Sequence, residues 1–390
     1  MGPRMKKALL VIVPDILSDL VAKGEITTRY YNPGDLFDAV HLLMTNNDQP
    51  DPKVLQKTVG RARLFLHNLP PPSFPGTLGW QFIFLKRWVQ SGIKLAREIN
   101  PALMRVHGNF HNGYLAAQIK QQLGIPLVVS LHINPDEDLR GRTRWWPHWQ
   151  RWLFYKRMLP FEEITLRTAD WVLPVYEPIR SYAARRGARH IQVCYNVLNP
   201  EHLLAKKSYD LQTPPRIIAV GRQFEDKNPE NLIRALLRLP QARLTLVGDG
   251  PYHHYLQETA MALGVGDRTE FYQAIPNDQL CRMLPDFDIF ATHTEYWEIS
   301  KAVLEALLTG LPVVLNRRLG APVPELQGDF LLLVDNTPDG YFQALQKLLT
   351  DDAFREQLGL KAYAHAQEHW APAKTEEKFV EIYRQLISFS

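Results

Sequence analysis

The sequence has little cysteine and no long apolar run. Its two cysteines, Cys194 and Cys281, lie far apart and without metal-ligand spacing, so we expect neither a disulfide framework nor a zinc site. No stretch approaches the roughly 18 apolar residues of a membrane-spanning helix. The apolar run at 8–13 follows a basic start but ends at Pro14 without a small-residue cleavage site, which indicates a buried strand rather than a signal peptide. We therefore expect a cytoplasmic protein.

The chain also lacks a strong charge of one sign. Its 45 Lys and Arg residues nearly balance 41 Asp and Glu residues, for a net charge of +4. Such a balance, without a known nucleic-acid-binding motif, argues against a nucleic-acid partner. Since a single core stops growing near roughly 250–300 residues, a chain of 390 residues predicts two domains.

Short apolar runs alternate with amphipathic segments along both halves. In the first half we expect strands at 8–13, 39–44, 62–66, 103–107, 126–131, 171–175 and 191–195. In the second half we expect strands at 216–220, 242–247, 269–272, 289–292 and 312–315. Helical patterns lie between them, and a last helix is expected at 375–386. Strands that alternate with helices predict doubly wound α/β sheets.

A polar segment with two prolines, at 201–215, indicates a domain boundary. We predict an acceptor-binding domain at 1–205, onto which a helix at 372–390 packs back. We predict a donor-binding domain at 206–371.

Ligands of open α/β sheets bind beyond the carboxyl ends of the strands. Directly after 216–220 come Gly221, Arg222 and Lys227. Glycine permits close backbone approach, and the two cations can converge on a diphosphate. The alternative is that both are solvated surface cations. After 242–247, Gly248 and Gly250 either turn the chain into a helix that faces an anion or form a plain turn.

Glu305 stands in an otherwise apolar helical segment, 303–308. A carboxylate there is costly if it is buried without partners, and a ribose diol would supply two hydroxyl donors. The alternative is a glutamate that faces solvent.

In the first half, His107, Asn109 and His111 follow the strand at 103–107. They are candidates for an acceptor-binding loop, although a single histidine is more often structural. The stretch 139–161 is rich in arginine and tryptophan, which suits a membrane interface. It equally suits a helix packed on the sheet with its arginines in water, or a surface that binds sugar rings.

An ordered set of motifs in the second half is similar to a known family. The set comprises Val220-Gly221-Arg222 with Lys227, the turn LVGDGP at 246–251, the run LEALLTGLPVV at 304–314, and Gly320 with Glu325. Together they resemble the retaining glycosyltransferases of family 4, which have the GT-B fold. That fold would be two Rossmann-like, doubly wound domains that face each other across a cleft. The first half resembles the family more weakly, at 124–132, 169–172 and 196–197.

The resemblance implies a role for each matching position. Arg222 and Lys227 would bind the diphosphate, Glu305 the ribose, and His132 would lie near the reaction centre. The remaining donor-binding positions would be Gly221, Gly248, Gly250, Gln273, Ala274, Ile275, Ile299, Ser300 and Lys301. The family uses no metal or other cofactor, and the co-substrate would be a UDP or GDP sugar.

One motif departs from the family pattern. The family has two glutamates separated by seven residues, and counting back from Glu305 gives Trp297. Glutamates stand instead at Glu295 and Glu298. Either Glu298 or Glu295 takes the catalytic, sugar-facing role, or the sugar subsite is altered.

The implied activity is transfer of a sugar, with retention, to a glycan, lipid-linked or small-molecule hydroxyl. The process would be cell-surface polysaccharide or glycoconjugate synthesis. An epimerase or hydrolase of the same fold, or a non-catalytic subunit that binds nucleotide sugar, remains an alternative. The stretch 139–161 would add a peripheral contact with the inner face of the membrane.

Overall fold

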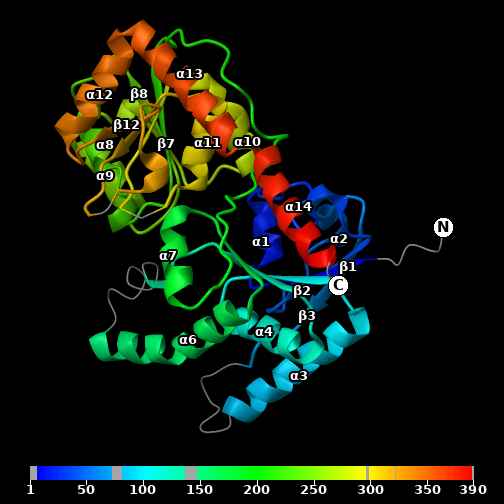
Figure 1. Cartoon of the computed structure of the whole chain (residues 1–390). Helices are drawn as coiled ribbons and strands as arrows, with labels where there is room; N and C mark the ends of the chain where they lie inside the picture. Colours follow the sequence, from blue (N-terminus) through cyan, green and yellow to red (C-terminus); the bar gives the residue numbers. More distant parts are fainter. Residues whose placement is uncertain (1–6, 73–80, 137–146, 296–297, 321, 389–390) are drawn as a thin grey trace. The chain divides into compact units, whose positions relative to one another are not determined.

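The computed structural model describes residues 7–72, 81–136, 147–295, 298–320 and 322–388. The chain divides into two compact units (Figure 1). Unit 1 comprises Met1–Ala22, Ile26–Val197 and Ala373–Ser390, and unit 2 comprises Lys23–Glu25 and Leu198–Pro372.

Unit 1 is built on a parallel sheet of six strands in the order β3-β2-β1-β4-β5-β6. The strands are β1 (Ala8–Val13), β2 (Ala39–Met44), β3 (Arg63–Asn68), β4 (Leu103–His107), β5 (Leu127–Leu131) and β6 (Trp171–Pro174). The central strands β4 and β5 are buried at every position. This burial explains why β5 is largely apolar rather than alternating, whereas β4 also buries Arg105 and His107.

Helices cover both faces of this sheet (Figure 1). The helices of unit 1 include α1 (Leu17–Ala22), α2 (Pro52–Leu55), α3 (Gln81–Ile99), α4 (His111–Leu123), α6 (His148–Thr168), α7 (Glu177–Arg185) and α14 (Pro372–Ser388). Apolar side chains of α1, α2 and α14 share one core cluster with β1 and β2. On the other side α4 packs between α3 and α6, so these three helices form one layer.

Unit 2 repeats the plan with strand order β12-β11-β10-β7-β8-β9, again parallel in every pair. The strands are β7 (Arg216–Val220), β8 (Arg243–Val247), β9 (Thr269–Tyr272), β10 (Ile289–Thr292), β11 (Val313–Asn316) and β12 (Leu332–Val334). Its helices include α8 (Glu230–Leu236), α9 (His253–Ala262), α10 (Asn277–Met283), α11 (Lys301–Thr309), α12 (Pro338–Thr350) and α13 (Asp352–His369). The prediction of two Rossmann-like domains is confirmed.

The predicted strand at 191–195 is wrong. The segment runs beside β6 and donates from Gln192 N to Val172 O and from Cys194 N to Pro174 O, but only an isolated bridge at Ile191 forms. The ladder stops because Pro174 has no N–H to return. The predictions also missed β12, whose first two residues are only partly buried.

Candidate functional site

In unit 2 the loop after β7 holds the two predicted phosphate-binding cations. Arg222 is exposed, and its guanidinium carbon lies 5.7 Å from the ring centroid of Phe224. Lys227 is mostly buried, with 17% of its side chain exposed, and its Nζ lies 2.8 Å from Glu298 Oε1. The alternative of two solvated surface cations is therefore wrong for Lys227.

The glycine turn after β8 lies directly against this loop. Gln223 N donates to Asp249 O, and Gly221 N donates to Val247 O. A Cβ on Gly248 would overlap the carbonyl oxygen of Gly221, and one on Gly250 would overlap that of Gln223. Glycine is thus required here because two backbone segments approach each other without room for a side chain.

A side-chain pair that the sequence analysis missed joins the same two loops. His253 Nδ1 lies 2.8 Å from Gln223 Oε1 and 3.2 Å from Gly248 O. Because both partners are acceptors, Nδ1 carries the proton. Gln223 is 2% exposed and His253 8% exposed. Neither residue belongs to a motif of the family. The only indication in the sequence was that Gln223 directly follows the predicted phosphate-binding residue Arg222.

After β10, a hydrogen-bonded network holds the loop that leads to α11. Glu295 Oε1 accepts from Asn316 Nδ2 at 3.0 Å and lies 3.0 Å from His293 Nε2. Asn316, which ends β11, also accepts from Thr294 N at 2.8 Å. Glu295 is thus occupied in fixing this loop to the end of the neighbouring strand.

The side chain and backbone of Glu298 have partners different from those of Glu295. Its carboxylate pairs with Lys227, and its backbone oxygen accepts from Arg318 Nη2 at 2.7 Å. Of the two candidate glutamates, Glu298 is therefore the one that lies beside a predicted phosphate-binding residue. Trp297, where the family has its first glutamate, lies outside the described residues.

Glu305 is buried on α11, with 2% of the residue exposed. Its Oε1 accepts from Asn277 Nδ2 at 2.7 Å and lies 3.9 Å from Lys301 Nζ. Burial raises the pKa of Glu305, and the Lys301 charge and the Asn277 hydrogen bond oppose that shift. The alternative of a solvent-facing glutamate is therefore wrong.

The remaining donor-side positions gather at the same edge of the sheet. Ser300 caps α11, and its Oγ accepts from Val303 N at 3.3 Å. Ile299 is buried, Lys301 is partly exposed, and the segment 273–275 after β9 is exposed or half-exposed. Loops after β7, β8, β9 and β10, together with α11, thus bring together residues as far apart in the chain as Gly221 and Glu305, 84 positions (305 − 221), since the carboxyl ends of parallel strands share one edge.

In unit 1 the predicted histidines also lie at the carboxyl ends of strands. His107 ends β4 and His132 follows β5, with ring centroids 5.0 Å apart. His107 is 4% exposed, and its Nδ1 lies 3.9 Å from Asp15 Oδ2. Burial lowers the pKa of His132 to about 4, with a further contribution from the charge of Arg105. Burial likewise lowers the pKa of His107 and of His111.

Asn109 belongs to a buried chain of hydrogen bonds. Its Nδ2 donates to Tyr182 Oη at 2.5 Å, and that hydroxyl donates to Glu162 Oε2 at 2.7 Å. Asn109 and Glu162 are both 1% exposed. Arg186 Nε also donates to Glu162, at 3.0 Å. This geometry makes Asn109 an anchor that ties its loop to α6 and α7, rather than a side chain that is free to contact an acceptor.

The basic aromatic stretch at 139–161 is described from residue 147 onward. There it forms the first two-thirds of α6, where Trp149 is 64% exposed and Trp152 is 60% exposed. The interpretation of a helix packed with its tryptophans on the sheet is therefore wrong for these two residues. Among the described helices, none is long and apolar enough to cross a bilayer.

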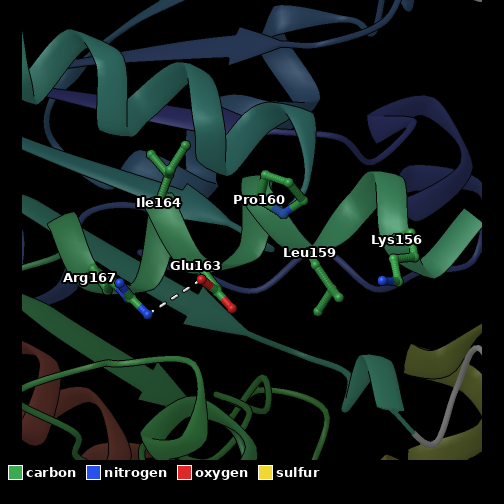
Figure 2. Close-up of a pocket in the computed structure, with 6 residues that line it drawn as sticks. All are labelled: Lys156, Leu159, Pro160, Glu163, Ile164 and Arg167. Carbon is green, nitrogen blue, oxygen red and sulfur yellow. Dashed lines mark ion pairs between the residues drawn. The ribbon is translucent and has the colours of Figure 1, made fainter.

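A groove of about 410 Å³ runs along the middle of α6. It is lined by Lys156, Leu159, Pro160, Glu163, Ile164 and Arg167. Figure 2 shows these side chains spread along the helix, with the Glu163–Arg167 ion pair at one end. The groove holds none of the predicted site residues and is considered separately below.

Comparison with known proteins finds a glycosyltransferase model in each half. "Glycosyl transferase 4-like domain" matches residues 35–196, and "Glycosyl transferases group 1" matches residues 204–365. The lipopolysaccharide core biosynthesis glycosyltransferase LpsE of Rhizobium meliloti is 28% identical over 51% of this chain and 58% of its own length. The GDP-mannose-dependent alpha-(1-6)-phosphatidylinositol monomannoside mannosyltransferase of Mycolicibacterium smegmatis is 32% identical over 43% of this chain and 45% of its own length. The chain spans about half the length of these curated relatives.

Among solved structures, the Anabaena protein HepE in complex with UDP and glucose has the same fold. The TM-score is 0.71 at 17% identity, over 97% of this chain and 99% of that one. Both halves of the chain thus match glycosyltransferase models, and both units have the parallel sheets of that fold. The chain belongs to the family 4 glycosyltransferases of the GT-B fold.

Proposed function

We propose that the chain transfers a sugar from a nucleoside diphosphate sugar to an acceptor hydroxyl, with retention of anomeric configuration. The observation that carries this proposal is the arrangement at the carboxyl edge of the unit 2 sheet. There, two cations on a short loop lie against a glycine turn, and a carboxylate is buried on the helix that follows β10. These groups supply a diphosphate site and a ribose site.

The donor is a UDP or GDP sugar in this proposal. HepE was solved with UDP and glucose, and the Mycolicibacterium relative is named for GDP-mannose. Glu305 would accept hydrogen bonds from the ribose hydroxyls, which would compensate its buried charge. The segment 273–275 would lie along the base. Backbone amides at Ile299, Ser300 and Lys301 would face the phosphates, as at other helix N-termini.

In the reaction, negative charge develops on the departing diphosphate. Arg222 and Lys227 would stabilise it, and one preorganised group of this kind contributes about 3–4 kcal/mol. Glu298, already held beside Lys227, would accept hydrogen bonds from the sugar hydroxyls. The acceptor hydroxyl would attack from the face that the diphosphate leaves, and a phosphate oxygen would take its proton. This sequence requires no strong protein base.

His132 fits this scheme as a neutral hydrogen-bonding group. With a pKa of about 4, it is uncharged near pH 7. It can therefore donate or accept a hydrogen bond at the reacting sugar without adding positive charge. His107 and His111 would line the acceptor side, and Asn109 would position their loop.

For the acceptor we propose a glycan or lipid-linked hydroxyl in cell-surface polysaccharide or glycoconjugate synthesis at the cytoplasmic face of a membrane. LpsE is named for lipopolysaccharide core biosynthesis, which supports this class. A small-molecule acceptor is the alternative. A peripheral membrane contact would use residues of unit 1 other than these.

The first experiment is a thermal-shift screen with UDP, GDP and their sugar conjugates. A ligand at about 100 times its Kd stabilises the folded state by about 2.7 kcal/mol, which raises the Tm by a few degrees. Arg222→Ala and Lys227→Ala should lose most of this shift. Arg243→Ala should keep it, because Arg243 is an exposed cation at the opposite end of β8.

Turnover is then measured with and without candidate acceptors. Retention is read from the anomeric configuration of the product by NMR. Donor consumption without any acceptor would point to an epimerase or hydrolase. Nucleotide binding without turnover would point to a non-catalytic subunit. Wild-type turnover in both cation variants would refute the proposed site.

A further inference from the structure

The first half of α6 exposes an aromatic stripe. Trp149, Trp152, Lys156 and Leu159 follow one another at spacings of three and four residues, so they share one helix face. Lys156 Nζ lies 5.1 Å from the ring centroid of Trp152. The two tryptophans are more than half exposed, which is unusual for so large an apolar side chain. We call these four residues the α6 stripe.

The stripe continues into the groove shown in Figure 2. Pro160 lies one turn beyond Lys156, and Glu163 and Ile164 follow one turn later. Leu159, Pro160 and Ile164 form the apolar part of the groove. Lys156 and Arg167 stand at its two ends. The face thus combines an apolar strip with a lysine at one end and the Glu163–Arg167 ion pair at the other.

A second exposed apolar site lies on α3, in the same helical layer. Ile83 is 45% exposed and Phe84 is 42% exposed, and Lys86 and Arg87 next to them are exposed. Because helices that connect parallel strands run antiparallel to those strands, α3 and α6 both begin at the carboxyl edge of the sheet. The exposed apolar residues of the two helices therefore lie toward the same end of the layer.

Most of this layer carries charge of one sign, and its acidic residues Glu98, Glu162 and Glu163 lie in the last turn of α3 and the last third of α6. The sequence contains no acidic residue in 81–97, in 111–123 or in 147–161, which cover most of α3, all of α4 and the first two-thirds of α6. The exposed charges in these segments include Lys86, Arg87, Lys156 and Arg157. Elsewhere in the chain acidic and basic residues nearly balance, so this segregation is local.

Exposed tryptophan with flanking lysine and arginine matches the chemistry of an anionic bilayer surface. Tryptophan combines an apolar body with an N–H group and partitions to the headgroup level. Each basic residue near an anionic surface strengthens binding about fivefold.

We propose that the α3–α6 face binds the surface of a membrane that contains anionic lipid, with Trp149 and Trp152 inserted at the headgroup level. Ile83 and Phe84 provide a second apolar contact, and Lys86, Arg87, Lys156 and Arg157 contact lipid phosphates. This inference concerns unit 1 alone and does not depend on the proposed donor site.

The test is co-sedimentation of the full chain with vesicles of phosphatidylcholine containing about 30 mol% phosphatidylglycerol, at salt concentrations of about 50–300 mM. We expect pelleting that weakens as salt rises and that is much lower with phosphatidylcholine alone. Trp149→Ala and Trp152→Ala should each lower the partition coefficient about tenfold. Lys156→Gln should lower it about fivefold.

Matched controls are Met261→Ala and Lys53→Gln. Met261 is 74% exposed on α9 of unit 2, and Lys53 is an exposed cation on α2, away from the α3–α4–α6 layer. Both should partition like the wild type. The Tm of the tryptophan variants without nucleotide should equal that of the wild type, which shows that they fold and keeps this test independent of the donor site.

The proposal is overturned if the wild type does not pellet with anionic vesicles, or if the tryptophan variants pellet as well as it does. It is also overturned if sedimentation equilibrium shows a dimer that the tryptophan variants abolish, because the exposed face would then be occupied by a second copy.

Discussion

Replacing Gly248 with alanine tests the packing on which the proposed donor site depends. Gly248 has a φ of 146°, and an added Cβ would overlap the carbonyl oxygen of Gly221. Backbone strain of this kind costs about 1–3 kcal/mol, and forcing an extra methyl into a filled space costs about 1–3 kcal/mol more. Gly248→Ala should therefore lower the free energy of unfolding of unit 2 by about 2–6 kcal/mol.

Gly264 provides the matched control. It also has a positive φ, of 70°, but an added Cβ would meet no atom within 4 Å. Gly264→Ala should thus cost only the left-handed backbone term, about 1–2 kcal/mol. The assay is urea denaturation followed by circular dichroism, together with the Kd for UDP or GDP. Because the clash moves the loop that carries Arg222, nucleotide affinity should fall in Gly248→Ala and stay unchanged in Gly264→Ala. Equal denaturation midpoints for the two variants would refute the reasoning.

Two further predictions concern buried titratable groups. Because burial raises the pKa of Glu305, the folded state holds its proton more tightly than the unfolded state, so stability falls as the pH rises above the ordinary carboxyl range. Glu305→Gln should remove this loss of stability, so it should raise the Tm at pH 8 more than at pH 5. It should also weaken nucleotide binding. A Tm gain that is equal at both pH values would contradict the raised pKa of Glu305. Because the pKa of His132 is lowered to about 4, its contribution to stability is present above pH 6.5 and is lost as the pH falls from 6.5 toward 4. His132→Asn should flatten the stability profile in that window, and an unchanged profile would show that the folded state does not lower the pKa of His132.

The sequence was sufficient for the architecture because buried parallel strands are short and continuously apolar. The runs at 8–13, 39–44 and 289–292 are strands with those bounds. The edge of a sheet is harder to predict, since its residues are only partly buried. This explains both the missed β12 and the segment at 191–195, where the apolar pattern is present but Pro174 interrupts the ladder.

The candidate site was predictable where a motif ties residue type to backbone position. Gly248 and Gly250 were identified as a turn after a strand, and the structure gives the reason in the close approach of two loops, whereas a Cβ on Gly221 would meet no atom within 4 Å. Gln223 and His253 were not identified, because their hydrogen bond joins residues that are 30 positions apart. No local sequence pattern predicts such a contact.

By itself, then, the sequence determined two doubly wound domains, the strands after which ligand-binding loops follow, and the cations and carboxylates available on those loops. Only the tertiary structure decided how these side chains are used. It assigned Glu298 rather than Glu295 to Lys227, buried Glu305, tied Asn109 to Tyr182, and left Trp149 and Trp152 exposed. The physical reason is that periodicity defines which face of an element a residue occupies. Which residues pack against that face depends on segments that are distant in the chain. Lys227 and Glu298, for example, form an ion pair although they are 71 positions apart.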